Sequence, residues 1–278
     1  MHVALTGETE GYYADFEPLA ALAKVLQRGF FHDGTWSSFR SRDHGLPLDV
    51  DRVPGWRLVV ASQNHDQVGN RARGDRLSEA LDDDQLAVAA LLTLASPFTP
   101  MLFMGEEWGA STPFAFFTSH PEPDLGRAVS EGRLGEFAQM AWDTAAVPDP
   151  QDPATFESSR LDWSALESPR GRALLDCYRS LAELRRTLPA LTDPDLRRVS
   201  VELDEHERWL VLRRGAGMDA VTVAVNFSDR QTRVPLGDDA ASVVAFATPG
   251  AARPVSSPVE GDHLLLPPHV GLLLKPMV

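Results

Sequence analysis

The sequence predicts an α/β region with buried parallel strands, followed by a small all-β sandwich. In the first region, helix-type runs alternate with short apolar runs that each end in polar residues. That alternation is typical of βα units in a parallel sheet or barrel. Beyond residue 190, short β-type runs separated by turn residues take over. We therefore expect two domains, at residues 1–190 and 191–278.

The composition favours a folded protein with an acidic surface. Apolar residues form 43% of the chain, enough to bury a core. A formal net charge of −14 disfavours nucleic acid and anionic membranes as partners and suits a neutral substrate, although acidity that serves only solubility fits equally well. Cys177 is the single cysteine, which excludes an intramolecular disulfide bond and fits a cytoplasmic location. The N-terminus lacks the pattern of a signal peptide, and Pro97 and Pro100 interrupt the longest apolar stretch.

Periodicity, capping residues and turn residues give the expected elements of both regions. Apolar residues at helical spacing mark helices, and short continuous apolar runs mark strands buried on both faces. In the first region we expect a helix with Asp15 as its N-cap and Gly29 as its stop, a loop over Phe30–Gly55, a strand over Arg57–Gln63, a helix over Asp82–Leu94, a strand over Met101–Met104, a helix over Asp124–Met140, a loop over Val147–Pro153 and a helix over Arg170–Leu188. In the second we expect strands over Arg197–Leu203, Trp209–Arg213, Ala220–Asn226, Thr232–Leu236, Val243–Ala247, Leu264–Leu266 and Gly271–Leu274.

The residues at the end of the first expected strand carry the clearest functional signal. Asn64, His65 and Asp66 follow the run Arg57–Gln63 directly, and active sites lie at the carboxyl ends of barrel strands. Asp66 could accept hydrogen bonds from sugar hydroxyls and stabilise positive charge at an anomeric carbon, while His65 could donate to a hydroxyl. From the triplet alone, a structural histidine beside a helix-capping aspartate is the alternative.

A longer run around this triplet resembles a known family. Residues Gln63–Arg71 resemble the fourth conserved region of the α-amylase clan, in the form found in malto-oligosyltrehalose trehalohydrolases. Further stretches are similar to that family and occur in its order, namely Leu5–Glu8, Gly11–Asp15, Phe39–Arg40, His44–Gly45, Pro100–Glu107, Pro113–Phe114, Phe116–Thr118, Gly132–Arg133 and Glu136–Phe137. The resemblance is strong over residues 1–163 and implies the C-terminal part of a (β/α)8 TIM barrel before the sandwich.

The resemblance also implies roles for individual residues. Asp66 matches the clan's transition-state stabiliser, and His65 matches its sugar-binding histidine. Asn64 is expected to order the strand tip and to contact substrate. The other substrate-binding candidates are Gln67, Glu107 and Tyr13, while Glu106, Tyr12, Phe114, Phe116 and Phe117 are open between binding and structural roles.

The sequence also departs from the family pattern. A retaining glycosidase needs a nucleophilic carboxylate and a separate acid. No stretch resembles the clan's Gly-Phe-Arg-x-Asp nucleophile motif, and no strand-like run before Asp66 ends in a glutamate. We therefore expect a chain that is inactive alone and that works with the missing N-terminal half of the same enzyme.

The family implies hydrolysis of the α-1,4-glucosidic bond next to the trehalose end of maltooligosyltrehalose, which releases trehalose. The expected partner is that saccharide or a related α-glucan. Two alternatives stay open: another enzyme of the clan, such as a glycogen-branching or debranching enzyme, and a non-catalytic saccharide-binding fragment. No cofactor is expected, and the spacing of cysteine and histidine gives no sign of a metal site.

Overall fold

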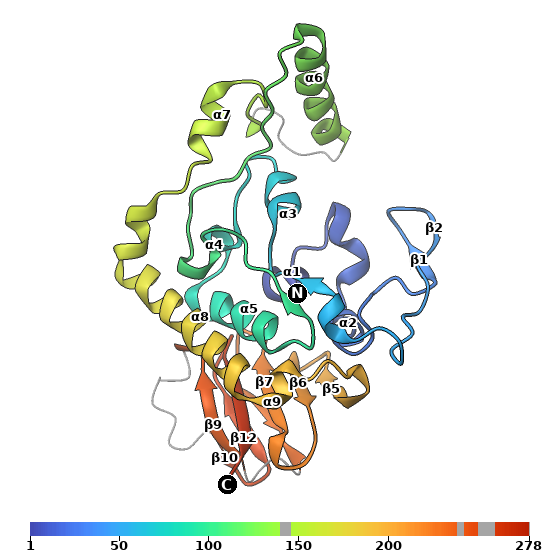
Figure 1. Ribbon diagram of the computed structural model, residues 1–278, viewed down its shortest axis with the longest axis vertical. Coiled ribbons are helices and arrows are strands. Elements are labelled where there is room, and N and C mark those ends of the chain that lie inside the picture. Colours follow the sequence, from blue (N-terminus) through green and yellow to red (C-terminus); the bar gives the residue numbers. More distant parts are fainter. Residues whose placement is uncertain (140–145, 238–241, 250–258, 278) are drawn as a thin grey trace. The chain divides into compact units, whose positions relative to one another are not determined.

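The computed structural model describes residues 1–139, 146–237, 242–249 and 259–277. They form two compact units, each made of separate stretches of the chain (Figure 1). Unit 1 comprises Met1–Ser62, Asp82–Met101 and Asp176–Val278, and unit 2 comprises Gln63–Leu81 and Leu102–Leu175. The domain boundary expected at residue 190 stays a prediction. Within the described ranges, every helix is too short or too polar to span a membrane.

Unit 1 contains two antiparallel sheets in the region where the sequence predicts a sandwich. The larger sheet has the strand order β5-β6-β7-β12-β9, and the smaller has the order β10-β11-β8. Every strand except β10 overlaps a predicted run. The strands are β5 (Val199–Asp204), β6 (Trp209–Arg214), β7 (Val221–Asn226), β8 (Thr232–Pro235), β9 (Ser242–Ala247), β10 (Val259–Glu260), β11 (His263–Leu266) and β12 (Gly271–Pro276).

The two sheets pack face to face through alternating apolar side chains. Their shared cluster consists of Val211, Ala224, Val234, Leu236, Leu264, Leu266, Val270, Leu272 and Leu274. The other face of β7 and β12 packs on helix α5 (Asp83–Ala95), which explains why β7 is buried along its whole length. A Cβ atom on Gly271 would lie 2.7 Å from Leu91 Cδ2, so glycine permits this close approach of helix and sheet.

Helix α5 confirms the second predicted helix and its start. Asp82 Oδ1 accepts a hydrogen bond from Gln85 N at 2.8 Å, and Gln85 Oε1 accepts one from Asp82 N at 3.0 Å, which forms a capping box. The residues from Leu86 to Ala95 are all buried, as expected of a helix that is apolar on every side. The other helices of unit 1 are α1 (His2–Thr6), α2 (Leu19–Arg28) and α9 (Pro189–Thr192), with 3₁₀ turns at Gly11–Phe16, Gly55–Arg57, Leu196–Arg198 and Gly217–Asp219.

The start of helix α2 differs from the prediction. The helix ends at Gly29 as expected, where φ is 84°. Its N-cap is Pro18, however, and Asp15 was wrongly predicted to fill that position. The Asp15 carboxylate instead accepts a hydrogen bond from Ser38 N at 2.9 Å, a partner distant in sequence. Local capping rules miss such a competitor because they consider only neighbouring residues.

The segment Phe30–Gly55 was expected to be loop throughout, and that expectation was wrong. It contains an antiparallel hairpin of two short strands, β1 (Thr35–Ser37) and β2 (Arg42–His44). Each strand has three residues, which is too few to show a period of two in the sequence. The hairpin places the ring of Trp36 and the side chain of its partner Asp43 on an exposed strand pair.

The two strands expected to be buried on both faces are shorter and more exposed than predicted. Strand β3 covers Val59–Val60 within the predicted Arg57–Gln63. Strand β4 covers Thr99–Pro100 and precedes the predicted Met101–Met104. The two pair in parallel, as the alternation of elements predicts. Val59 stays 62% exposed because, in the described part of the chain, β3 and β4 pair only with each other.

Unit 2 consists of helices and irregular segments. The helix predicted over Asp124–Met140 is confirmed as far as Gln139, and Met140 lies outside the described residues. The helix predicted from Arg170 is confirmed as α8 (Pro169–Thr187), which begins in unit 2 and ends in unit 1. The other elements are α3 (His65–Gly69), α4 (Leu77–Ala80), η3 (Glu106–Trp108), α6 (Pro123–Gln139), α7 (Pro153–Ser158) and η5 (Trp163–Glu167). The sequence did not predict α7 or η5, and Pro153, expected in a loop, is the first residue of α7.

A row of phenylalanine rings packs edge to face in unit 2. The ring centroids of Phe103 and Phe114 are 5.3 Å apart, those of Phe114 and Phe117 are 5.6 Å apart, and those of Phe117 and Phe156 are 5.3 Å apart. Such contacts are typical of packed interiors. Phe114 and Phe117 are half-buried in this row, and their role in binding or in packing stays a prediction.

Candidate active site

The triplet Asn64-His65-Asp66 lies at the start of the short helix α3. Asn64 has an extended backbone, and its Oδ1 atom accepts a hydrogen bond from Gln67 N at 3.0 Å. Asn64 is therefore the N-cap of α3 and fixes the direction in which the helix leaves the preceding segment. Because Asn64 fills the capping position, Asp66 is not the helix cap that the alternative interpretation required.

The side chains of His65 and Asp66 face solvent. They are 68% and 74% exposed, and His65 Nε2 lies 3.3 Å from Asp66 Oδ1. Their backbone is ordered by the cap and by the hydrogen bond from Asn70 N to Asp66 O at 2.9 Å. The result is a carboxylate and an imidazole side by side, held on a fixed backbone and open to a ligand.

Gln67 differs from these two neighbours because its amide is turned inward. Its Oε1 atom is buried and has no hydrogen-bond partner among the described residues. A buried acceptor without a partner costs free energy, so such an atom often accepts a hydrogen bond from water or from a ligand. Gln67 is thus placed one residue after Asp66 with an unused acceptor.

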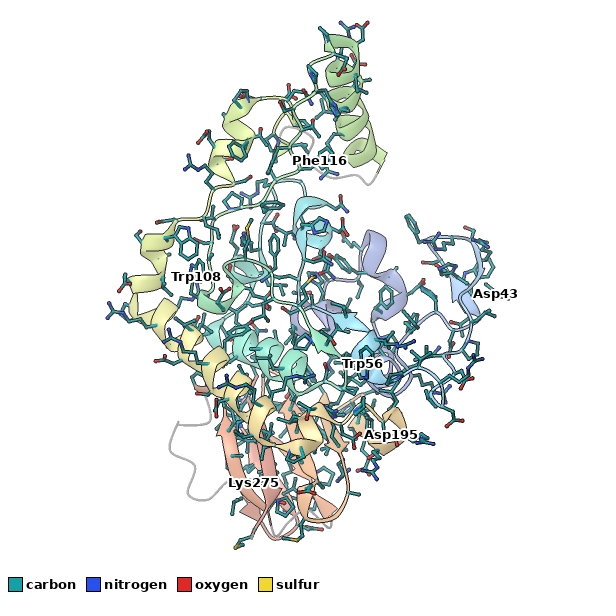
Figure 2. The ribbon with its side chains drawn as sticks, in the orientation of Figure 1. Asp43, Trp56, Trp108, Phe116, Asp195 and Lys275 are labelled. Carbon is teal, nitrogen blue, oxygen red and sulfur yellow. The ribbon has the colours of Figure 1, made fainter. Side chains whose placement is uncertain are left out.

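The neighbouring carboxylates Glu106 and Glu107 lie on the turn η3. The buried Glu106 accepts a hydrogen bond from Phe103 N at 2.9 Å, so it holds the segment that leads into the turn. Glu107 differs, since its Oε2 atom is buried but has no partner in the described part of the chain. Trp108, which is labelled in Figure 2, follows Glu107. Its buried indole packs against Trp163, with ring centroids 4.9 Å apart.

Arg76 stabilises this turn, and the sequence analysis missed it. The side chain is only 2% exposed, and its guanidinium donates hydrogen bonds to Thr112 O at 2.5 Å and to Met104 O at 2.8 Å. Burial lowers the pKa of Arg76, and the nearby carboxylates of Glu106 and Glu107 act in the opposite direction. No local pattern could have marked Arg76, because its partners lie far away in sequence.

Tyr13, the remaining predicted substrate-binding residue, belongs to unit 1. Its ring stacks on the imidazole of His2, with centroids 4.2 Å apart and planes at 15°. His2 Nε2 in turn lies 2.8 Å from Glu8 Oε2. One face of the Tyr13 ring is therefore already covered within unit 1. The structure brings Asn64, His65, Asp66 and Gln67 together on one helix, whereas Tyr13 is part of a separate unit.

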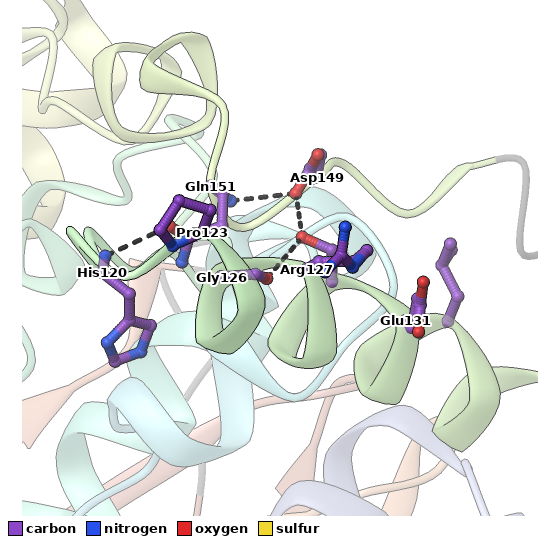
Figure 3. A pocket seen from close by; sticks show the side chains of 9 residues that line it. His120, Pro123, Gly126, Arg127, Glu131, Asp149 and Gln151 are labelled. Atoms are coloured by element: carbon purple, nitrogen blue, oxygen red, sulfur yellow. Dashed lines mark hydrogen bonds between the residues drawn. The ribbon is translucent and has the colours of Figure 1, made fainter.

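A cavity of about 420 Å³ in unit 2 contains none of the predicted site residues (Figure 3). It is lined by His120, Pro123, Gly126, Arg127, Ser130, Glu131, Leu134, Asp149 and Gln151. The Asp149 carboxylate accepts hydrogen bonds from Ser130 Oγ at 2.6 Å and from Gln151 N at 2.9 Å. These two hydrogen bonds lower the pKa of Asp149, so the charged carboxylate ties α6 to the segment before α7. Across the described ranges, no group of three or more His, Cys, Asp or Glu side chains is arranged to hold a metal ion.

Comparison with known proteins places the chain among its relatives. No family model matches it. The chain is 53% identical over 275 residues to a malto-oligosyltrehalose trehalohydrolase from Brevibacterium helvolum, and 51% identical over 275 residues to one from Rhizobium sp.. Each alignment covers 99% of this chain. The chain belongs to the malto-oligosyltrehalose trehalohydrolase family. It spans 45% and 44% of the lengths of these two relatives, as expected for the C-terminal portion that the sequence predicts.

Solved structures resemble the chain in fold. A Salmonella typhimurium protein described as a candidate α-amylase has a TM-score of 0.81 and 34% identity, over 99% of this chain and 44% of that one. An isomaltulose synthase mutant from Erwinia rhapontici has a TM-score of 0.50 and 16% identity over 78% of this chain, a likeness that concerns the fold alone. The fold is therefore that of a part of α-amylase-family enzymes.

Proposed function

We propose that this chain supplies the transition-state-stabilising carboxylate and part of the saccharide-binding surface of a malto-oligosyltrehalose trehalohydrolase. The reaction is retaining hydrolysis of the α-1,4-glucosidic bond next to the trehalose end of maltooligosyltrehalose. The observation that carries this proposal is the 53% identity over 99% of the chain, combined with an exposed Asp66 on a capped helix.

Asp66 has the chemistry that this reaction needs. Positive charge develops at the anomeric carbon in an oxocarbenium-like transition state. A carboxylate whose backbone is already fixed can stabilise that charge without reorganising, and exclusion of water by the bound saccharide strengthens the interaction. His65, whose Nε2 atom lies 3.3 Å from Asp66, donates a hydrogen bond to a sugar hydroxyl beside it. The unused Gln67 Oε1 accepts a hydrogen bond from a further hydroxyl or from a water that contacts the saccharide.

The nucleophile and the acid come from the part of the family that this chain does not span. Retaining glycosidases hold these two carboxyl groups about 5–5.5 Å apart. The chain spans 45% of the Brevibacterium helvolum relative, and its sequence contains no nucleophile motif of the clan. We infer that the 278 residues alone do not turn over substrate.

The exposed strands β3 and β4 support a partial (β/α)8 barrel. All-parallel sheets occur almost only with both faces covered. Here a two-stranded parallel ladder leaves Val59 and Met101 exposed. Unpaired strand edges of this kind readily accept further strands. Strands from the rest of the barrel would cover these edges.

Reconstitution tests the proposal. The chain is fused behind the part of the Brevibacterium helvolum relative that precedes the matched segment, and trehalose release from maltooligosyltrehalose is measured. We expect turnover by the fusion, none by the chain alone, and almost none by the fusion with Asp66→Asn. Asp176→Asn is the matched control, because Asp176 is exposed on α8 and pairs with Arg179 at the surface. Near-normal turnover by the Asp66→Asn fusion would overturn the proposal.

The likeness to the Salmonella typhimurium protein favours one second candidate, another α-glucan-cleaving activity of the same clan. Comparing maltooligosyltrehalose with maltooligosaccharides of equal length separates the two candidates. Cleavage of both substrates at similar kcat/KM would favour the broader activity. Binding of maltooligosaccharide without cleavage by the fusion would favour a saccharide-binding fragment.

A further inference from the structure

Arg133 is a buried cation on helix α6. Its side chain is 8% exposed, although an arginine on a helix usually reaches solvent. The guanidinium lies over the ring of Phe116, with its central carbon 5.0 Å from the ring centroid, and Phe116 is labelled in Figure 2. A guanidinium buried in this way is stable only where its N–H groups find acceptors.

Those acceptors are at the C-terminal end of helix α3. Arg133 Nη2 donates a hydrogen bond to the carbonyl oxygen of Gly69, the last residue of the helix. Arg133 Nη1 lies 3.4 Å from Oδ1 of Asn70, the residue that caps this end. The last carbonyls of a helix have no partners within it, so an arginine fork that binds there fixes the helix end.

Asn70 connects Arg133 to Asp66. Asn70 receives the Arg133 guanidinium on its side chain, and its backbone N donates to Asp66 O at 2.9 Å. The carboxylate of Asp66 is 74% exposed, so its own side chain has few contacts that would hold it. The position of that carboxylate therefore depends on the helix backbone, which Asn64 fixes at one end and Arg133 at the other.

We propose that Arg133 is a positioning residue for Asp66, which holds the C-terminal end of α3 so that the Asp66 carboxylate keeps one place against the bound saccharide. This inference rests on the proposed role of Asp66. Arg133 acts on the helix backbone through its hydrogen bonds to Gly69 and Asn70. A lysine has one ammonium group on a flexible stem and lacks the planar fork that lets arginine hold two separate acceptors while it lies over the Phe116 ring.

Amide hydrogen exchange in the 278-residue chain tests the contact without any need for turnover. We expect Arg133→Met to speed exchange of the Asn70 and Arg71 amides about tenfold, because the helix end loses a charged hydrogen-bond donor. Arg133→Lys should give a smaller increase. Asn70→Ala, which keeps the bond to Gly69 O, should also give a smaller increase. Arg160→Met is the matched control, since Arg160 lies in the same unit but is exposed and pairs with Glu157 at the surface.

Kinetics of the fusion tests the consequence for Asp66. Arg133→Met should lower kcat about tenfold while KM changes less than about twofold, because a displaced carboxylate fails mainly in the transition state. In the Asp66→Asn background the same substitution should have no further effect on kcat. An equal loss of kcat in both backgrounds would show that Arg133 acts independently of Asp66 and would overturn the proposal.

The two tests separate this proposal from the proposed function. Unchanged exchange in Arg133→Met refutes the positioning role, whether or not the fusion is active. If the fusion shows no turnover at all, the proposed function fails, and the backbone order parameter of Asp66 measured by NMR decides the positioning role instead. A lowered order parameter in Arg133→Met, with an unchanged value in Arg160→Met, supports it, and equal values in both variants refute it.

Discussion

Arg185 and Arg214 donate hydrogen bonds to the same atom, the carbonyl oxygen of Ser96, at 2.9 and 2.8 Å. Arg185 also binds Leu94 O and Phe98 O, and Arg214 also binds the carbonyl oxygens of Ala95, Leu191 and Asp193. Together they bind Leu94 O and Ala95 O, two of the carbonyls that helix α5 leaves free at its end, and the carbonyl of the capping residue Ser96. Burial lowers the pKa of Arg214 to about 10, and the positive charge of Arg185 adds to that effect. Both guanidinium groups nevertheless stay charged at neutral pH.

Loss of Arg214 should therefore be costly. We expect Arg214→Met to lower the free energy of unfolding by about 3 kcal/mol, because several buried carbonyls lose their donor. Arg185→Met should cost less, since Arg214 still binds Ser96, and the two losses should not add. Urea unfolding followed by circular dichroism measures both. Arg186→Met is the control: this neighbour is exposed, pairs with Glu183, and should change stability by no more than about 1 kcal/mol.

Asp66 and His65 should differ in how much turnover they support. In the fusion, Asp66→Asn should reduce kcat about 10³-fold, roughly 4 kcal/mol of transition-state stabilisation, with little change in KM. His65→Ala should reduce kcat less, because it removes one hydrogen bond to sugar and no essential charge. Steady-state kinetics on maltooligosyltrehalose measures both. A larger loss from His65→Ala than from Asp66→Asn would contradict the assigned roles.

The cap of α3 makes a separate prediction. Asn64→Ala removes the acceptor for Gln67 N and should destabilise the helix by about 1 kcal/mol. Asn64→Asp keeps that acceptor and should leave the helix almost unchanged. Hydrogen exchange at the Gln67 amide should be about fivefold faster in the alanine variant and near normal in the aspartate variant. Equal exchange in the two variants would mean that the cap does not order the helix.

The lowered pKa of Asp149 predicts how the stability of the folded state around the cavity in unit 2 changes at acid pH. Hydrogen bonds from Ser130 and then from Gln151 lower the pKa of Asp149 in the folded state. Its contribution to stability is thus fully present above the unfolded pKa of about 3.9 and is lost as the pH falls through the lower folded pKa. Ser130→Ala should raise the pKa of Asp149 in an NMR titration and weaken this pH dependence. Ser180→Ala, an exposed serine on α8, should leave the pKa of Asp149 where it is.

The sequence predicts best those features that depend on neighbouring residues. Helix α5 begins where predicted because Asp82 and Gln85 cap it from within the same turn. Asp15 is not the N-cap of α2, because its carboxylate accepts a hydrogen bond from the backbone N of Ser38, a residue distant in sequence. The apolar runs Arg57–Gln63 and Met101–Met104 were predicted to be strands buried on both faces. Strand β3 covers only Val59–Val60 of the first run, and β4 precedes the second run, because a buried strand needs covering partners that the described residues supply only in part.

The candidate site follows the same division. The run Gln63–Arg71 marked Asn64, His65 and Asp66 as neighbours, and the capped helix α3 keeps them together. The sequence analysis did not identify Arg76 and Arg133 as buried residues. Their acceptors are backbone carbonyls far away in the sequence, and every residue type has such a carbonyl. Periodicity finds apolar faces, but it cannot find a buried cation whose partners any residue could provide.

The close approach of Leu91 to Gly271 has a consequence for dissecting this protein. Both faces of the larger sheet are covered: one packs on the smaller sheet, and the other packs on α5. Helix α5 comes from a stretch about a hundred residues earlier in the chain. A fragment that begins at residue 191 would keep the packing between the two sheets but would lose α5, which covers the other face of the larger sheet. Its β7 and β12 would then offer a flat apolar face to any strand or chain that could cover it. Adding back Asp83–Ala95, joined or as a peptide, is the smallest change that would close that face.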